Sequence, residues 1–330
     1  MGSIRPFKIP QDLAIMLSLI ENGFKYPENP DWNMQDDEKQ SMLDSVNSIR
    51  SIWPLIRFLQ IFVPFLRDLM HGFIYEEDDK PAGLVNFGRQ RNIPEWFIGN
   101  VTVLPEYRRR GIARRLVEAS LTELRKRKAR LASLEVITEN VPAYRLYEKL
   151  GFTAYSSSSD YDIQLDEPIP GISADNSVIH EKLGFHDWKT RMEFVQRITP
   201  EDIQRYEPVR KERFKSSIVV HVLAPLIQLL SGSKSEQFAI FKDDKTVAVG
   251  TYTYRTKTGG VNNARIQVDP AHPELASAAL NHVLSSVQRN SPGRRLEIHL
   301  KHWQPALLQA AEDAGCTKRY TFHQMAKRFD

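Results

Sequence analysis

The chain has 330 residues, of which 41% are hydrophobic and 26% charged, with a formal net charge of +4. This is the composition of an ordinary globular protein long enough for two domains, and it excludes a disordered or low-complexity chain. A single cysteine, Cys316, excludes a disulfide framework and a thiolate metal site, so we expect a reducing compartment and no metal.

The first ninety residues are predicted to contain two helices and three strands. Residues 4–9 form a strand, and a helix with Asp12 in its first turn follows. Residues 26–40 are polar and rich in proline, which indicates a loop. Residues 41–70 are helical with kinks at prolines, and their apolar part is too interrupted to span a membrane. Apolar runs at 73–75 and 82–87 flank an acidic turn and predict a hairpin.

Residues 98–113 contain a short strand, a basic turn and the start of a helix. Pro105 ends the strand, and apolar residues recur at helical spacing from Ala113 to Lys128. The turn between them holds three consecutive arginines and Gly111. Because a helix start presents unpaired N–H groups and glycine lets an anion approach closely, we predict a phosphate or pyrophosphate site here. A solvated helix cap is the alternative.

The basic run at 125–130 has no aromatic residues among its charges. We interpret it as the solvated face of a helix, and we expect no nucleic-acid partner. The first half then continues with a strand at 134–137 and a helix at 140–150 that ends at Gly151. Strands at 152–155 and 161–165 follow. This order predicts a mixed α/β sheet with helices on its faces.

The pattern of the first half recurs after a segment rich in proline at 167–173. Several short segments repeat in the same order and at similar spacing; for example, residues 198–203 echo 9–13, and residues 266–270 echo 101–105. We interpret the chain as a tandem duplication. The predicted domains are residues 1–165 and 192–330, with residues 166–191 as a linker.

Three segments of the first half resemble the GNAT superfamily of N-acetyltransferases. They are Arg108-x-x-Gly111-x-Ala113, Leu134-Glu135-Val136 followed by Asn140, and the run from Leu146 to Phe152. The resemblance covers residues 98–152 and is nearest to ribosomal-protein N-terminal alanine acetyltransferases. It implies an α/β fold of two tandem GNAT-type domains, each a splayed mixed sheet flanked by helices.

The resemblance implies acetyl-CoA as the co-substrate, with direct transfer of its acetyl group to an amine. The pyrophosphate would bind to the basic turn, and the pantetheine arm would pair with the preceding strand where the sheet splays open. The implied binding residues are Val101, Thr102, Val103, Arg108, Arg109, Arg110, Gly111, Ile112 and Ala113. Asn140 would contact the pantetheine; a helix N-cap is its alternative role.

Two residues match catalytic positions of the family. Tyr147 matches the general acid that protonates the departing thiolate, with simple packing in the helix as the alternative. Glu135 matches a base proposed to act through water; an outward-facing strand residue is the alternative. Asn100 and Thr102 stand where many members carry a glutamate, so a base in direct contact with the amine is not expected.

The second half lacks the features of the donor site. Its turn reads Pro273 to Ala278 without the arginine or the glycine, and alanine occupies the position of Tyr147. We therefore expect one active site per chain and a degenerate second domain in which Cys316 is a small core residue.

The resulting hypothesis is a cytoplasmic N-acetyltransferase, monomeric or homodimeric, without a membrane partner. The alternative is a non-catalytic module that binds acyl-CoA or serves assembly. The acceptor is predicted to lie between the kinked helical region and the strands after Phe152. Trp32, Trp53, Trp96 and Tyr161 are candidates for its walls or for the core.

Overall fold

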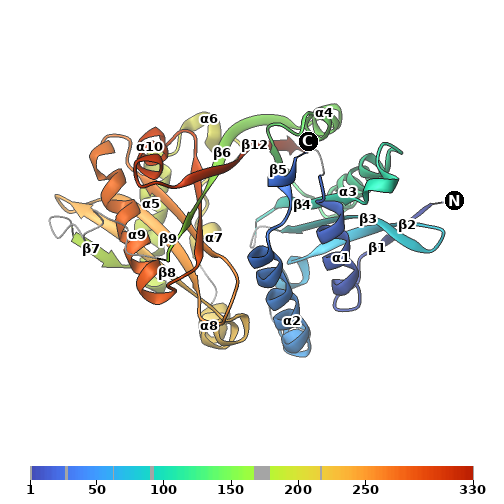
Figure 1. Ribbon diagram of the computed structural model, residues 1–330, viewed down its shortest axis with the longest axis horizontal. Coiled ribbons are helices and arrows are strands. Elements are labelled where there is room, and N and C mark those ends of the chain that lie inside the picture. The colour runs from blue at the N-terminus through green and yellow to red at the C-terminus, as the bar shows by residue number, and fades with distance from the viewer. Residues whose placement is uncertain are drawn as a thin grey trace. The chain divides into compact units, whose positions relative to one another are not determined.

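The computed structural model describes residues 2–26, 29–61, 63–89, 93–166, 179–215 and 218–329 (Figure 1). The chain divides into two compact units. Unit 1 consists of Met1–Tyr155 together with His323–Asp330, and unit 2 consists of Ser156–Phe322. No helix in the described part of the chain is both long and apolar enough to cross a membrane.

Unit 1 is a mixed sheet with helices on both faces. The sheet runs in the order β1 (Ser3–Pro6), β2 (His71–Glu77), β3 (Lys80–Arg89), β4 (Glu95–Val103), β5 (Leu131–Ile137) and the end of β12 (Thr317–Arg328). One face packs against α1 (Leu13–Gly23) and α2 (Asp36–Leu59). The other packs against α3 (Ile112–Lys126) and α4 (Val141–Lys149). Short 3-10 turns lie at η1 (Pro30–Trp32), η2 (Pro64–Asp68) and η3 (Pro105–Tyr107).

The predicted helical region at 41–70 begins earlier and ends earlier than expected. Its helix, α2, begins at Asp36, where the Gln35 N–H donates to Glu38 Oε2 over 2.8 Å. This contact belongs to a capping arrangement that satisfies the first turn of the helix. The helix passes through Pro54 and ends at Leu59. The predicted loop at 26–40 is correspondingly shorter.

The β2–β3 hairpin confirms the prediction from the acidic turn. Asp78 and Asp79 have φ angles of 49° and 61°, which are the left-handed values that a tight hairpin turn needs. Unit 2 has the same turn at Asp243 and Asp244, with φ angles of 50° and 59°. The two turns occupy equivalent places in the repeat.

Two features open the sheet of unit 1 at the end of β4. The parallel pairing of β4 with β5 extends over Glu95–Phe97 and Leu131–Ser133. Beyond it, β4 contains a bulge, because Leu84 faces Thr102 whereas Asn86 faces Gly99. Asn100 lies in the extra length with a φ of 31°. A bulge bends the strand and interrupts its ladder, so backbone groups of β4 face open space beside β5.

Unit 2 repeats this architecture. Its sheet runs in the order β6 (Thr153–Gln164), β11 (Arg295–Lys301), β10 (Asn262–Val268), β9 (Lys245–Arg255), β8 (Ser233–Lys242) and β7 (Ile179–Lys182). Its helices are α5 (Trp188–Ile198), α6 (Glu201–Gln204), α7 (Lys211–Phe214), α8 (Ile218–Ser231), α9 (Ala276–Asn290) and α10 (Pro305–Asp313), with 3-10 turns at η4 (Phe185–Asp187) and η5 (Pro273–Leu275). The helices α9 and α10 cover a core that includes the buried Cys316, as predicted.

The observed division differs from the predicted boundaries at 165 and 192. The two strands predicted at 152–155 and 161–165 form one strand, β6, which starts in unit 1 and continues in unit 2. The strand β12 does the reverse, and its last residues belong to unit 1. Of the predicted linker, residues 179–191 form β7, η4 and the start of α5; residues 167–178 lie outside the described part. Strand propensity does not say which sheet a strand joins.

Candidate functional site

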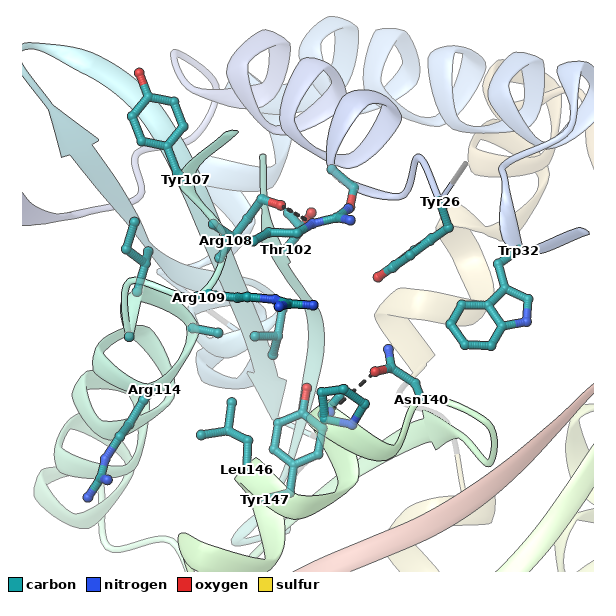
Figure 2. Close-up of a pocket in the computed structure, with 18 of the residues that line it drawn as sticks. Tyr26, Trp32, Thr102, Tyr107, Arg108, Arg109, Arg114, Asn140, Leu146 and Tyr147 are labelled. Carbon is teal, nitrogen blue, oxygen red and sulfur yellow. Dashed lines mark hydrogen bonds between the residues drawn. The ribbon is translucent and has the colours of Figure 1, made fainter. Parts of the chain in front are cut away.

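A cavity of about 480 Å³ lies in unit 1 (Figure 2). Its walls come from the segment after α1, the end of β4, the basic turn before α3 and the first turns of α4. Most of the predicted site residues line it: Val101, Thr102, Val103, Arg108, Arg109, Gly111, Ile112, Ala113, Asn140 and Tyr147. The predicted residues Arg110 and Glu135 are not among them.

The turn before α3 presents backbone donors to this cavity. Gly111 is the N-cap of α3 and has a φ of 75°, a left-handed conformation that glycine adopts without strain. The first bond of the helix is donated by the Arg115 N–H to the Gly111 carbonyl over 3.1 Å. The N–H groups of the three residues between them therefore have no acceptor within the helix. A Cβ added at Gly111 would meet no atom within 4 Å, so the space beside these donors is open.

The strand end beside the turn is shaped by the bulge. Val101, Thr102 and Val103 all line the cavity. The Thr102 side chain is buried and its hydroxyl donates to the Leu19 carbonyl over 3.4 Å, so it faces α1. Because β4 has left β5 at this point, its backbone is accessible to an extended ligand that pairs like a strand. These observations fit a linear arm ending in an anion that sits on the start of α3.

Arg108 has a different environment from the one predicted for an anion ligand. Its guanidinium donates to the carbonyls of Gly23 and Lys25, each over 3.0 Å, and to that of Val103 over 3.3 Å. It also lies 4.6 Å from the centre of the Tyr26 ring. The Arg108 N–H donates to the Pro105 carbonyl. Both the side chain and the N–H of Arg108 are thus engaged within the chain.

The other two arginines of the turn differ from each other. Arg109 has a φ of 62°, and its side chain extends into the cavity toward Tyr147 (Figure 2). Arg110 donates to the Glu106 carbonyl over 2.9 Å and lies over the Tyr107 ring. The left-handed backbone at Arg109 turns consecutive side chains in different directions, which the sequence pattern does not reveal. Arg114, which the sequence analysis missed, lines the cavity and pairs with Glu118 over 2.8 Å.

Tyr147 is buried in α4, where its ring packs edge-on to Phe152 at 6.1 Å. Figure 2 shows its hydroxyl pointing into the cavity. Burial raises the pKa of Tyr147 well above its usual value, and the nearby Tyr26 phenol raises it further. The phenol is therefore protonated throughout the neutral range, as a proton donor must be.

Asn140 caps the helix that carries Tyr147. Its Oδ1 accepts the Ala143 N–H over 3.2 Å, which is the alternative role considered for it. Asn140 also lines the cavity, so its amide group lies beside the space that a ligand would occupy (Figure 2).

Glu135 lies away from this cavity. It is exposed on β5 between the buried residues Leu134 and Val136, which pack in the same core cluster as Tyr147. Side chains alternate along a strand, so Glu135 points to the opposite face. Its Oε1 accepts from Gln324 Nε2 over 3.1 Å. Among the described residues that line the cavity, the single carboxylate belongs to Glu139, which accepts from the Thr138 hydroxyl.

An aromatic wall closes the cavity on the side of α1. Tyr26 and Trp32 pack edge to face with ring centres 5.2 Å apart, and both line the cavity (Figure 2). Trp32 was a candidate, whereas Tyr26 lies in a predicted loop without a motif that would single it out. Trp96 is buried in the core of unit 1, and Tyr161 is buried in the core of unit 2.

Unit 2 lacks each part of this site. Its strands β10 and β11 stay paired through Arg265 and His299, and the register of β10 with β9 has no bulge. No residue between Val268 and Ala276, all of which are described, has a positive φ. The turn η5 therefore leads into α9 without the left-handed N-cap of unit 1.

Two side chains of unit 2 lie at the positions that correspond to the strand end and the phenol of the unit 1 site. Gln304 Oε1 accepts the Val268 N–H over 2.9 Å, at the strand end that corresponds to Val103. Ala311 corresponds to Tyr147, because the Cys316 N–H bonds to the Ala311 carbonyl just as the Phe152 N–H bonds to that of Tyr147. Unit 2 thus has an amide oxygen on the N–H of the strand end and no phenol at the position of Tyr147.

Comparison with known proteins agrees with this geometry. Residues 33–152 match the family model described as "Acetyltransferase (GNAT) family". The [Ribosomal protein bS18]-alanine N-acetyltransferase of Escherichia coli K12 is 40% identical over 62 residues, which are 19% of this chain and 42% of that protein. An N-alpha-acetyltransferase of Saccharolobus solfataricus is 48% identical over 54 residues, which are 16% of this chain and 32% of that protein. Each match thus spans less than half of the relative.

Solved structures match over nearly the full chain. A tandem GNAT protein from the clavulanic acid biosynthesis pathway has a TM-score of 0.63 at 12% identity and covers 99% of this chain and 98% of its own. A GCN5-related N-acetyltransferase from Sphaerobacter thermophilus has a TM-score of 0.67 at 15% identity and covers 99% and 95%. At such low identity these matches show the fold.

Proposed function

We propose that this chain is an N-acetyltransferase of the GNAT family whose active site is the cavity of unit 1, because the family model matches residues 33–152 and the chain has the tandem fold of the matching solved structures. The enzyme moves the acetyl group of acetyl-CoA directly to an amine. The observation that carries the proposal is the convergence of the Gly111 turn, the bulged end of β4 and the buried phenol of Tyr147 on one cavity.

The donor site follows from the open backbone groups. The free N–H groups at the start of α3 hold the pyrophosphate, and Arg109 adds charge beside it. The pantetheine arm pairs with residues 101–103 beside Asn140. Acetyl-CoA supplies the activated thioester. An N–H near Val103 stabilises the negative charge that develops on the carbonyl oxygen during attack.

The proton transfers are assigned to Tyr147 and to one of two glutamates. The neutral amine attacks the carbonyl carbon, the bond from carbon to sulfur breaks, and the Tyr147 hydroxyl gives its proton to the departing thiolate. Its high pKa keeps this hydroxyl protonated before the transfer. Afterwards the phenolate regains a proton from solvent. The base that takes the proton from the amine is Glu135, as the family pattern predicts, or Glu139, as the lining of the cavity suggests.

Paired variants distinguish the two bases. If Glu139 is the base, Glu139→Gln lowers kcat about 100-fold and abolishes the acidic limb of the rate profile, whereas Glu135→Gln has little effect. The opposite ranking assigns the base to Glu135. Steady-state kinetics from pH 5 to pH 10 measure both variants against the unaltered enzyme.

The acceptor we favour is the α-amine of a peptide. The relatives with matching segments are named a ribosomal protein bS18-alanine N-acetyltransferase and an N-alpha-acetyltransferase, and the aromatic wall of Tyr26 and Trp32 can contact an apolar first side chain. The test is release of CoA thiol with peptides that begin with alanine, serine or methionine, compared with polyamines and aminoglycosides. Turnover confined to the peptides supports the assignment, and turnover confined to the other amines contradicts it.

A non-catalytic module that binds acyl-CoA is the second candidate. Its support is the degenerate second unit, which has the fold without the site. Tyr147 distinguishes the two functions, because a module that only binds needs no proton donor. Tight binding of acetyl-CoA without turnover of any amine in the panel would favour this second candidate.

A further inference from the structure

The side chain of Arg108 joins two parts of unit 1 that are far apart in the sequence. Two of its carbonyl partners are Gly23, the last residue of α1, and Lys25, just after it; they lie 85 and 83 positions away. The third, Val103, is the last residue of β4. One guanidinium thus ties the segment after α1 to the strand end and the turn that form the donor site.

The segment held by Arg108 carries the aromatic wall of the cavity. Tyr26 lies between the guanidinium of Arg108, 4.6 Å from its ring centre, and Trp32, 5.2 Å from it. Within the segment, the Tyr26 N–H donates to Asn33 Oδ1 over 2.8 Å, and the Asn29 N–H donates to the Tyr26 carbonyl over 3.0 Å. The aromatic wall is therefore held together by its own hydrogen bonds and ring contact, and Arg108 attaches it to the donor turn.

A close approach of α1 to β4 also fixes the aromatic wall relative to the donor turn. A Cβ at Gly23 would lie 1.9 Å from the Thr102 hydroxyl, so only glycine allows this separation. The Gly23 carbonyl that Arg108 holds is thus placed directly against the bulged end of β4. A shift of this contact would move the aromatic wall relative to the donor site.

We infer that Arg108 is a positioning residue that sets the acceptor wall against the donor turn, and that it is not an anion ligand. The inference rests on the proposed function. Acetyl-CoA is held by the backbone at Gly111 and its neighbours, whereas Arg108 determines where Tyr26 and Trp32 stand when the acceptor enters. Loss of Arg108 therefore weakens acceptor binding and leaves the donor affinity nearly unchanged.

The geometry requires arginine in particular. A guanidinium is planar and has five N–H donors, so it can serve three carbonyls while its face lies over a ring. The ammonium group of lysine keeps the charge, but it cannot reproduce this fork. Unit 2 has Pro273 at the corresponding position, and there the donor site is absent as well.

The variants Arg108→Lys and Arg108→Gln test the inference, with Arg50→Gln on the exposed face of α2 as the matched control. Calorimetry gives the affinity for acetyl-CoA, and hydrogen exchange reports the order of residues 23–26 and 29–33 with and without acetyl-CoA. The thiol-release assay gives KM for whichever peptide the unaltered enzyme acetylates best.

In both Arg108 variants we expect the amides of residues 23–26 and 29–33 to exchange about tenfold faster and the acceptor KM to rise about tenfold, which corresponds to roughly 1.4 kcal/mol. The acetyl-CoA affinity should stay within about twofold, and Arg50→Gln should resemble the unaltered enzyme. The lysine variant distinguishes an anion ligand from a positioning residue. An anion ligand needs only the positive charge, which lysine keeps, whereas a positioning residue needs the planar guanidinium with its several N–H donors, which lysine lacks.

The inference is overturned if Arg108→Lys restores normal exchange and acceptor KM, or if Arg108→Gln loses acetyl-CoA affinity in proportion to its loss of activity. Failure of the proposed function looks different, since the unaltered chain itself would then not bind acetyl-CoA. Hydrogen exchange needs no acceptor, so it also tests the role of Arg108 separately from turnover.

Discussion

Single residues determine the donor end of the cavity through backbone conformation. Gly111 combines a left-handed φ with open space where a side chain would project. The same position carries the N-cap of α3, so conformation and electrostatics favour an anion at one point. An alanine here would fill part of the space that the anion needs.

We predict that Gly111→Ala lowers the affinity for acetyl-CoA at least about tenfold. The left-handed backbone costs a residue with a Cβ about 1 kcal/mol of stability, and the new methyl group intrudes on the anion site. Calorimetry measures the affinity and urea unfolding measures the stability. Equal affinity in the variant and the unaltered protein would show that the anion binds elsewhere.

Tyr147 is the second residue on which the site depends, and Tyr147→Phe removes only its hydroxyl. We predict that kcat falls about 100-fold or more while the acetyl-CoA affinity is unchanged, because the ring and its contact with Phe152 remain. Because burial raises the pKa of the phenol, its ionisation should not produce an alkaline limb below about pH 10. A rate unaffected by the substitution would assign the acid to another group.

At the scale of elements, the position of α1 matters because this helix leads into the aromatic wall. An ion pair fixes its start: Arg5 of β1 bonds to both carboxylate oxygens of Asp12, over 2.7 and 3.0 Å. The Lys8 N–H donates to the same carboxylate over 2.7 Å. Burial alone would raise the pKa of Asp12, but these hydrogen bonds outweigh it and hold the pKa below its usual 3.8.

We therefore predict that Asp12→Asn lowers the free energy of unfolding by about 2 kcal/mol at pH 7. A carboxyl group whose pKa is lower in the folded state stabilises the fold above its unfolded pKa, and this contribution is lost as the pH falls through the folded pKa. The difference between the two proteins should therefore shrink below about pH 4. Urea unfolding between pH 3 and pH 7 measures it, and a constant difference would contradict the assignment.

The ends of two equivalent strand pairs, β4 with β5 in unit 1 and β10 with β11 in unit 2, differ in whether they leave room for a ligand. In unit 1 the bulge at Asn100 and the early end of pairing leave β4 open beside β5. In unit 2 the pairing of β10 with β11 continues to Arg265, and Gln304 Oε1 accepts the Val268 N–H. A buried N–H needs a partner, and at this strand end Gln304 provides it where unit 1 leaves room for a ligand.

At the scale of the whole molecule, the duplicated fold predicts one donor site per chain. Calorimetric titration with acetyl-CoA should give a stoichiometry near one, because the turn before α9 in unit 2 has no left-handed residue and the Val268 N–H is already taken by Gln304. In the Gly111→Ala variant this single binding event should weaken, with no tight binding left. A second binding event that survives in the variant would show that unit 2 also binds the donor.

Features that are local along the chain could be predicted from the amino-acid sequence alone. The basic turn, the helix that begins at its glycine, the hairpin turns and the position of Tyr147 each lie within a few consecutive residues. Local conformation depends on those residues, so their pattern is enough to predict it. The tandem duplication was visible for the same reason, since repeated local patterns recur in order.

Contacts between distant residues became visible in the tertiary structure alone. Arg108 looked like an anion ligand, yet two of its three carbonyl partners lie more than eighty positions away, at the end of α1 and just after it. Glu135 had the right neighbours in sequence, but its strand turns it away from the cavity. The passage of β6 and β12 from one unit into the other was likewise hidden. Such contacts depend on how elements pack and pair, and neither composition nor periodicity specifies the partner of a side chain or a strand.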